Sequence, residues 1–183
     1  MSQNLEQEWI SAKNRRTESP SGHPLVIEPY RAEYQESVIS HILGIQRDEF
    51  LIPVTIDDQP DLLSIEGVYQ AGRGNFFVAR RRDEVIGTIG LIDIGNRRGA
   101  LRKMFVKPGY RGKPFNAGQL LWQRLLEWSR SQGLAEIYLG THPFFHAAHR
   151  FYEKNGFQEI GRDKLPAGFQ AMKVDTRFYR YII

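Results

Sequence analysis

The stretch LRKMFVKPGYRGKPFNAGQLLWQRLLEW, residues 101–128, decides the fold that this sequence predicts. Residues 101–106 alternate side chains between two faces, which indicates a β-strand. Pro108 and Gly109 end that strand, because proline lacks a backbone donor and glycine permits a turn. From about Ala117 apolar residues recur at helical spacing. The stretch therefore predicts a strand, a short basic loop and a long amphipathic helix.

The start of this helix has the features of an anion-binding site. Asn116, followed three residues later by Gln119, matches a capping box. The preceding loop carries Arg111, Gly112 and Lys113. A helix N-terminus offers free N–H groups and the positive end of the helix dipole. We therefore interpret Arg111 and Lys113 as parts of an anion site rather than of an ordinary solvated turn.

The segment VKPGYRGKPFNAGQLL resembles the acyl-CoA-binding segment of the GNAT superfamily of N-acyltransferases. In that family the run Arg/Gln-x-x-Gly-x-Gly/Ala cradles the CoA pyrophosphate with backbone amides. Counting from Arg111, two small positions of the family pattern fall on Pro114 and Asn116. We interpret this as a one-residue insertion, in which Ala117 and Gly118 stand in for the small residues. Pro114 has no N–H to add to the cradle.

A second segment carries the same resemblance. The run AHRFYEKNGF, residues 148–157, is similar to the other recurring GNAT motif, a short helix followed by a turn into the next strand. The two segments have the family's order and separation, and the resemblance covers residues 75–160. The chain is thus identified as a member of the GNAT superfamily.

The resemblance implies an α/β (α+β) GNAT fold: a mixed, mostly antiparallel sheet of six to seven strands, flanked by about four helices. The long helix is a crossover between strands at 101–106 and 135–141, which suggests that these two strands are parallel and joined in the right-handed sense. In the family this central pair splays apart, and the acyl-pantetheine slots between the strands. The other elements that we expect are strands at 25–30, 75–82, 84–94, 157–160 and 176–181, a helix at 31–50, and a helix that Asp57 or Asp58 caps.

Length and composition bound the alternatives. The 183 residues predict one domain at 25–183, preceded by a polar, partly mobile arm at 1–24. The 25 basic and 21 acidic side chains are interspersed and leave a net charge of +4, which suits a polyanion such as CoA without requiring nucleic acid. There is no cysteine, which excludes disulfides and a thiol nucleophile. No apolar run is long enough to span a membrane, so we expect a cytoplasmic protein.

The chemistry implied by the resemblance is acyl transfer to an amine. The amine must lose a proton, the tetrahedral oxyanion needs a donor, and the departing thiolate needs a proton. By analogy with the family, backbone N–H groups of Met104, Phe105 and Val106 bind the pantetheine and polarise the thioester. Tyr152 occupies the position of a family tyrosine close to the CoA sulfur, which makes it our choice of general acid. The alternative is that Tyr152 only packs its helix against the sheet.

His142, at the end of the strand at 135–141, is the candidate general base, because the unperturbed pKa of histidine suits that role. A water chain with no single base is the alternative. We expect Pro143 to be the first residue of the next helix, with His142 as its cap. The three histidines His142, His146 and His149 lack a carboxylate at matching spacing, so we predict no metal site.

The leading hypothesis is an N-acetyltransferase that uses acetyl-CoA and a small-molecule or amino-acid-like amine. The alternative is a GNAT-fold module that binds acyl-CoA without efficient turnover. A nucleic-acid-binding protein is a third reading, suggested by arginine runs at 80–82 and 97–98, but solvated hairpin turns account for them better. Homodimers are common in the family, so the resemblance allows one. The acidic residues at positions 49, 57, 58 and 61 either cap helices or attract a cationic acceptor.

Overall fold

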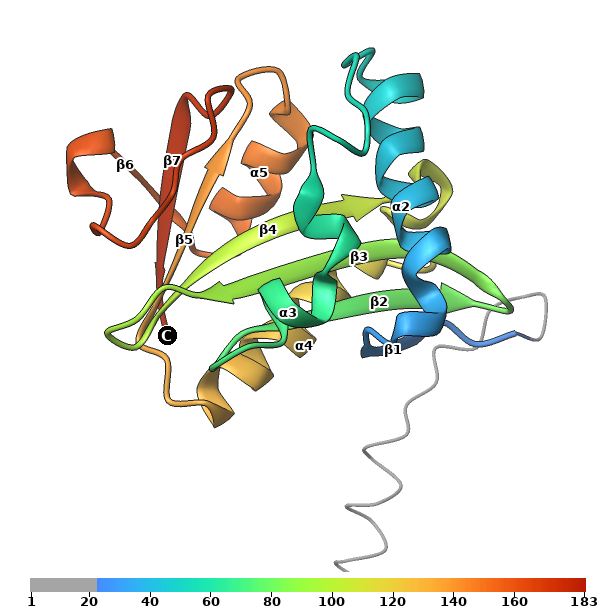
Figure 1. Cartoon of the computed structure of the whole chain (residues 1–183), viewed down its shortest axis with the longest axis horizontal. Coiled ribbons are helices and arrows are strands. Elements are labelled where there is room, and N and C mark those ends of the chain that lie inside the picture. The colour runs from blue at the N-terminus through green and yellow to red at the C-terminus, as the bar shows by residue number, and fades with distance from the viewer. Residues whose placement is uncertain (1–22) are drawn as a thin grey trace, which may run out of the picture.

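The computed structural model describes residues 23–183, which form one seven-stranded sheet with helices on both faces (Figure 1). Nearly all of the arm expected at residues 1–24 therefore lies outside the described residues. The strand order across the sheet is β1-β2-β3-β4-β5-β7-β6. The strands are β1 (Val26–Pro29), β2 (Asn75–Arg81), β3 (Glu84–Asp93), β4 (Arg98–Val106), β5 (Glu136–Thr141), β6 (Gln158–Ile160) and β7 (Arg177–Ile182).

Four α-helices lie within residues 23–183, and short helical turns extend or connect them. The α-helices are α2 (Gln35–Gly44), α3 (Ile65–Tyr69), α4 (Ala117–Ser131) and α5 (His146–Lys154). A 3-10 turn, Ala32–Tyr34, precedes α2, and a π-helical segment, Ile45–Glu49, follows it. Further 3-10 turns are Pro60–Leu63, Pro108–Tyr110 and Arg162–Lys164. The fold predicted from the sequence is confirmed, strand for strand.

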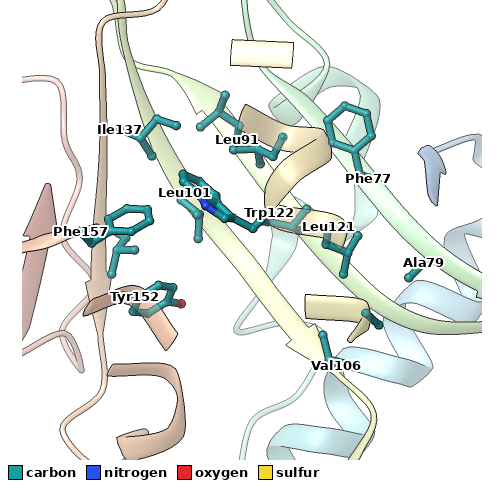
Figure 2. Close-up of a cluster of buried hydrophobic side chains, with 14 of the residues drawn as sticks. Phe77, Ala79, Leu91, Leu101, Val106, Leu121, Trp122, Ile137, Tyr152 and Phe157 are labelled. Carbon is teal, nitrogen blue, oxygen red and sulfur yellow. The ribbon is translucent and has the colours of Figure 1, made fainter. Parts of the chain in front are cut away.

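The two faces of the sheet bury separate apolar clusters. On one face Leu121 and Trp122 of α4 pack with Tyr152 of α5 against Leu91 and Leu101 of the sheet (Figure 2). On the other face α2 and α3 pack against β2 and β3. Figure 1 shows α2 and α3 on the near side and α4 on the far side. Burial of apolar surface on both faces is the main contribution to the stability of such a layered domain.

The parallel strands β4 and β5 pair only over their first residues. Arg98, Gly99 and Ala100 lie opposite Glu136, Ile137 and Tyr138, and beyond them no register continues between the two strands. Figure 1 shows the strands diverging from this common start. The splay that the family resemblance implied is therefore present. It leaves the β5-facing edge of β4 without a strand partner from Leu101 onward within residues 23–183.

A bulge in β4 changes which side chains share a face. Gly90 of β3 lies opposite Arg102, whereas Thr88 lies opposite Phe105, so one residue of β3 faces two of β4. Lys103 takes up the extra residue with a φ of 51°. The bulge breaks the alternation of the strand, and the side chains of Arg102 and Lys103 both make their contacts on the face opposite α4.

Three local predictions about helix starts are wrong. Asn116 precedes α4 as expected, but in a left-handed conformation (φ 47°) with no side-chain cap, so the capping box is not formed. Asp58 caps no helix. Its carboxylate instead accepts hydrogen bonds from the N–H and hydroxyl of Thr55, at 2.8 and 3.0 Å. Helix α5 begins at His146 rather than at Pro143. In each case the connecting loop, rather than the cap residue, determines where the helix starts.

Candidate active site

The candidate active site lies where β4 and β5 separate, between the start of α4 and the α5 helix. The side chains of Met104 and Val106 point from β4 into the α4 and α5 layer. A Cβ added to Gly118 would lie only 3.8 Å from Met104 Cε and Val106 Cγ2. The first turn of α4 thus lies in van der Waals range of β4 at this position. The predicted pantetheine strand and the predicted anion loop are thus neighbours in space.

The first turn of α4 keeps N–H groups available for an anion. The N–H of Gln119 is bonded back to the Asn116 carbonyl at 2.9 Å, so those of Ala117 and Gly118 remain at the open end of the helix. Gly112 and Lys113 are exposed in the loop before it. These four residues occupy the place where the sequence predicts the pyrophosphate cradle, and their donors suit a polyanion.

Arg111 has a partner that the sequence did not reveal. Its Nε donates to the Val106 carbonyl at 2.7 Å, and its Nη1 and Nη2 both donate to the carboxylate of Glu49. Glu49 ends the π-helical segment after α2, 62 residues away in the chain. The guanidinium of Arg111 is thus shared between the β4 end and the α2 side, and any contact with a ligand phosphate competes with Glu49.

Tyr152 lies against the opening from the α4 and α5 face. Its ring packs against Phe157 and Tyr179, with centroids 5.5 and 5.8 Å away, and the residue is 6% exposed. Figure 2 shows its hydroxyl oxygen on the side of the ring that faces β4, away from Phe157. Burial, together with the nearby charges of Asp175 and Tyr179, raises the pKa of Tyr152. The phenol therefore keeps its proton at neutral pH and can donate it.

His142 follows β5 directly and is partly buried. Its Nδ1 accepts a hydrogen bond from the Phe144 N–H at 3.3 Å, and its ring packs against Phe145 at 5.4 Å. His149, which is 3% exposed, donates from Nε2 to the His142 carbonyl and accepts from Arg177 at Nδ1. Both ring nitrogens of His149 are thereby occupied. Within residues 23–183 no group of three His, Asp or Glu side chains is arranged to hold a metal ion.

Two of the four acidic residues at positions 49, 57, 58 and 61 are paired with cationic side chains. Asp61 accepts a hydrogen bond from the Tyr69 hydroxyl at 2.5 Å and lies 3.2 Å from Lys103 Nζ. The Lys103 side chain is only 9% exposed, and burial lowers its pKa. Glu49 is paired with Arg111 as described above. Two of the four carboxylates of this patch, Glu49 and Asp61, are thus compensated by cations, which weakens the hypothesis that the patch attracts a cationic acceptor. Asp57 and Asp58 are exposed.

Sequence reasoning missed one side chain at the opening, Asp175. It lies in the loop before β7 and is 6% exposed, and its Oδ2 accepts a hydrogen bond from the Met172 N–H at 2.9 Å. Arg102 Nη1 lies 3.7 Å from the same oxygen. No motif marks Asp175, because its neighbours in space, Arg102 and Gly140, are distant in the chain.

With this geometry, the comparisons with known proteins agree on one class. The sequence model of the Acetyltransferase (GNAT) family matches residues 39–157. A GNAT-family acetyltransferase from Staphylococcus aureus Mu50 is 41% identical, with a TM-score of 0.82, over 86% of this chain and 98% of that one. An acetyltransferase from Streptococcus agalactiae is 29% identical, with a TM-score of 0.83, over 87% of this chain and 98% of that one. The chain belongs to the GNAT acetyltransferase family, a class of acyltransferases.

Among curated proteins, N-acetylaspartate synthetase from Xenopus tropicalis is 33% identical over 105 residues, which are 55% of this chain and 37% of that protein. The match covers well under half of that relative's length. Within the described residues, no helix has the length and apolar character needed to cross a membrane.

Proposed function

We propose that this protein is an N-acetyltransferase that transfers the acetyl group of acetyl-CoA to a primary amine of a small-molecule or amino-acid-like acceptor. The observation that carries the proposal is the meeting, at one opening, of the unpaired edge of β4, the N-terminus of α4 and the Tyr152 hydroxyl. Direct attack in a ternary complex needs all three. Family membership and the relative named N-acetylaspartate synthetase support the same reaction class.

The residues present suit acetyl-CoA as a substrate. The amides of Ala117 and Gly118, with Gly112 and Lys113 in the loop, would hold the pyrophosphate. The open β4 edge at Met104, Phe105 and Val106 would pair with the pantetheine amides. The Phe105 carbonyl already accepts a hydrogen bond from His41 Nε2 at 3.3 Å, which ties this strand to α2. Backbone donors suit both tasks because they need no reorganisation when charge develops.

In the reaction that we propose, the amine nitrogen attacks the thioester carbonyl and the carbon–sulfur bond then breaks. Tyr152 supplies a proton to the departing thiolate, because burial keeps its phenol protonated at neutral pH. His142, at the end of β5, is the sequence-predicted candidate for removing the amine proton. With Nδ1 accepting the Phe144 N–H, a neutral His142 carries its own proton on Nε2, and neither nitrogen then has a free lone pair.

Two measurements test the proposal. Calorimetric titration with acetyl-CoA and with free CoA should show binding of both. Thiol release is then followed with L-aspartate, L-alanine, putrescine and an alanine-initiated tetrapeptide, with L-aspartate first because of the curated relative. Turnover with any of these amines separates an enzyme from a module that only binds. Binding of acetyl-CoA without release of CoA above the hydrolysis background in every case would contradict the enzyme proposal.

A further inference from the structure

Asp175 lies against β5 where that strand has left β4. The position of Gly140 in β5 makes this approach feasible, since a Cβ added to Gly140 would lie 2.4 Å from Asp175 Oδ2. Any other residue at position 140 would push the carboxylate away. The main-chain N–H of Thr176 donates to the Thr141 carbonyl at 3.2 Å, which fixes the loop that carries Asp175 to the end of β5.

Asp175 also reaches toward β4. Its Oδ2 lies 3.7 Å from Nη1 of Arg102, in the part of β4 that has separated from β5. Arg102 is held in turn by the Gln170 carbonyl and by the ring of Phe169, 5.0 Å from its Cζ. The carboxylate therefore lies over the opening between the two strands. Tyr152 approaches the same opening from the opposite face, and the charge of Asp175 contributes to its raised pKa.

The surroundings of Asp175 leave it able to take a proton. Oδ2 has the contacts with Met172 and Arg102, whereas Oδ1 has no hydrogen-bond partner among residues 23–183. Burial raises the pKa of Asp175, and the Met172 N–H, Arg102, His142 and Arg162 act in the opposite direction. A carboxylate whose pKa is raised is a stronger base than one on the surface, and it stays available for proton transfer.

We propose that Asp175 is the general base, which takes the proton from the ammonium group of the acceptor through Oδ1, and that Arg102 is its positioning residue. This inference rests on the proposed acetyltransferase function. His142 is then a nearby group whose charge acts on Asp175, rather than the base itself.

The proton balance is complete with these residues. The acceptor R–NH3+ gives one proton to the Asp175 carboxylate, and the resulting R–NH2 forms the C–N bond with the thioester carbon. The carbonyl π-electrons move to oxygen and return as the C–S bond breaks, with the electron pair leaving on sulfur. The thiolate takes a proton from Tyr152, which recovers one from the nitrogen of the new amide. Asp175 then releases its proton to solvent, and the products are the amide, CoA and one proton.

The decisive experiment measures kcat/KM as a function of pH in the wild type and in Asp175→Asn. The acceptor is the amine, among the four proposed above, that the wild type acetylates fastest. Asparagine keeps the size of the side chain and can accept the Met172 N–H, but it takes up no proton. In the wild type, kcat/KM should stay constant over the pH range from the pKa of Asp175 up to the pKa of the amine, because Asp175 deprotonates the bound ammonium group. In the variant, it should rise with pH up to the amine pKa, because only free amine reacts, and kcat should fall about 10²–10⁴-fold.

Two further variants separate this role from packing. Asp163→Asn removes an exposed carboxylate, 73% accessible and paired with Lys164, and should leave the profile unchanged. Gly140→Ala keeps Asp175 but displaces its carboxylate, so kcat should fall while the affinity for acetyl-CoA stays within about twofold. A level region retained in Asp175→Asn would overturn the inference while the enzyme proposal stands. No turnover by the wild type would end the enzyme proposal and with it the role of Asp175.

Discussion

At the scale of the residue, the packing of Tyr152 and the proton donation that we propose for it use different parts of the side chain. Its ring packs within the cluster of α4, α5 and β7, and no hydrogen bond of its hydroxyl to another residue of 23–183 is present. The packing therefore depends on the ring, and the hydroxyl is not needed for it. The two contributions can be separated by removing the oxygen alone.

Tyr152→Phe should lower kcat by about 10–10³-fold, because the departing thiolate loses its proton donor. The affinity for acetyl-CoA and the unfolding midpoint should stay nearly unchanged, since no hydrogen bond within the fold is lost. Steady-state kinetics, calorimetry and thermal unfolding measure the three quantities. A lower melting temperature with unchanged kcat would show that Tyr152 serves packing only.

Arg111 should contribute to CoA binding less than an unpaired arginine would, because Glu49 shares its guanidinium. Arg111→Gln should weaken CoA binding about 3–10-fold at low salt, and the difference should shrink as ionic strength rises. Arg130→Gln, an exposed arginine near the other end of α4, is the matched control. Unchanged affinity in Arg111→Gln would remove this residue from the pyrophosphate site.

At the scale of the element, α4 both supports the sheet and presents the anion site. Leu121 is fully buried in the second turn of α4, and its Cδ1 would lie 3.0 Å from a Cβ added to Gly87 of β3. The helix is thus held against the sheet by side chains a few residues from the N–H groups of Ala117 and Gly118. Stability and CoA binding should therefore depend on the same element.

Leu121→Ala should lower the free energy of unfolding by about 2–5 kcal/mol, through lost apolar burial and the cavity that remains. Gln123→Ala, on the exposed side of the same helix, should change it by about 0.5 kcal/mol or less. Urea denaturation measures both values. A cost of less than about 1 kcal/mol for Leu121→Ala would mean that α4 relaxes into the cavity.

At the scale of the whole molecule, the α2 side is connected to both edges of the active-site opening. His41 of α2 donates to the Phe105 carbonyl of β4, and Glu49 holds Arg111. Phe50 packs on Phe145 in the β5–α5 turn, with ring centroids 4.5 Å apart. These contacts join segments from across the chain around one site. One of these contacts comes from His41, which is partly buried.

Burial lowers the pKa of His41 to about 4, so the folded protein holds it neutral where an unfolded chain binds a proton. The contribution of neutral His41 to the free energy of unfolding is therefore complete above a pH of about 6.5 and is lost as the pH falls toward about 4. Lowering the pKa from 6.5 to about 4 limits this contribution to the free energy of unfolding to at most about 3.4 kcal/mol, at about 1.36 kcal/mol per pH unit. His41→Gln should therefore flatten the pH dependence of the unfolding free energy in this window, whereas the exposed His146→Gln should not. Equal slopes in both variants would contradict this assignment.

The sequence by itself determined the order of strands and helices along the chain, from local signals such as alternation in residues 101–106 and helical spacing after Ala117. The family and the splay of the central strands followed from the resemblance of two segments, residues 106–121 and 148–157, to the GNAT motifs. These segments, with Arg111 and Tyr152, could be located because each motif is a short local pattern. What the local pattern predicted least well was the helix starts, because Asn116 and Asp58 have competing backbone and loop conformations available to them.

Only the tertiary structure decided which charges meet. The pairing of Arg111 with Glu49 joins residues 62 positions apart, and the approach of Asp175 to Gly140 requires β7 to lie beside β5. The bulge at Lys103 brings two successive cationic side chains to one face, where each meets a carboxylate from a different segment. Such contacts depend on strand order and register, which arise from packing of the whole sheet and leave no periodic trace in the sequence.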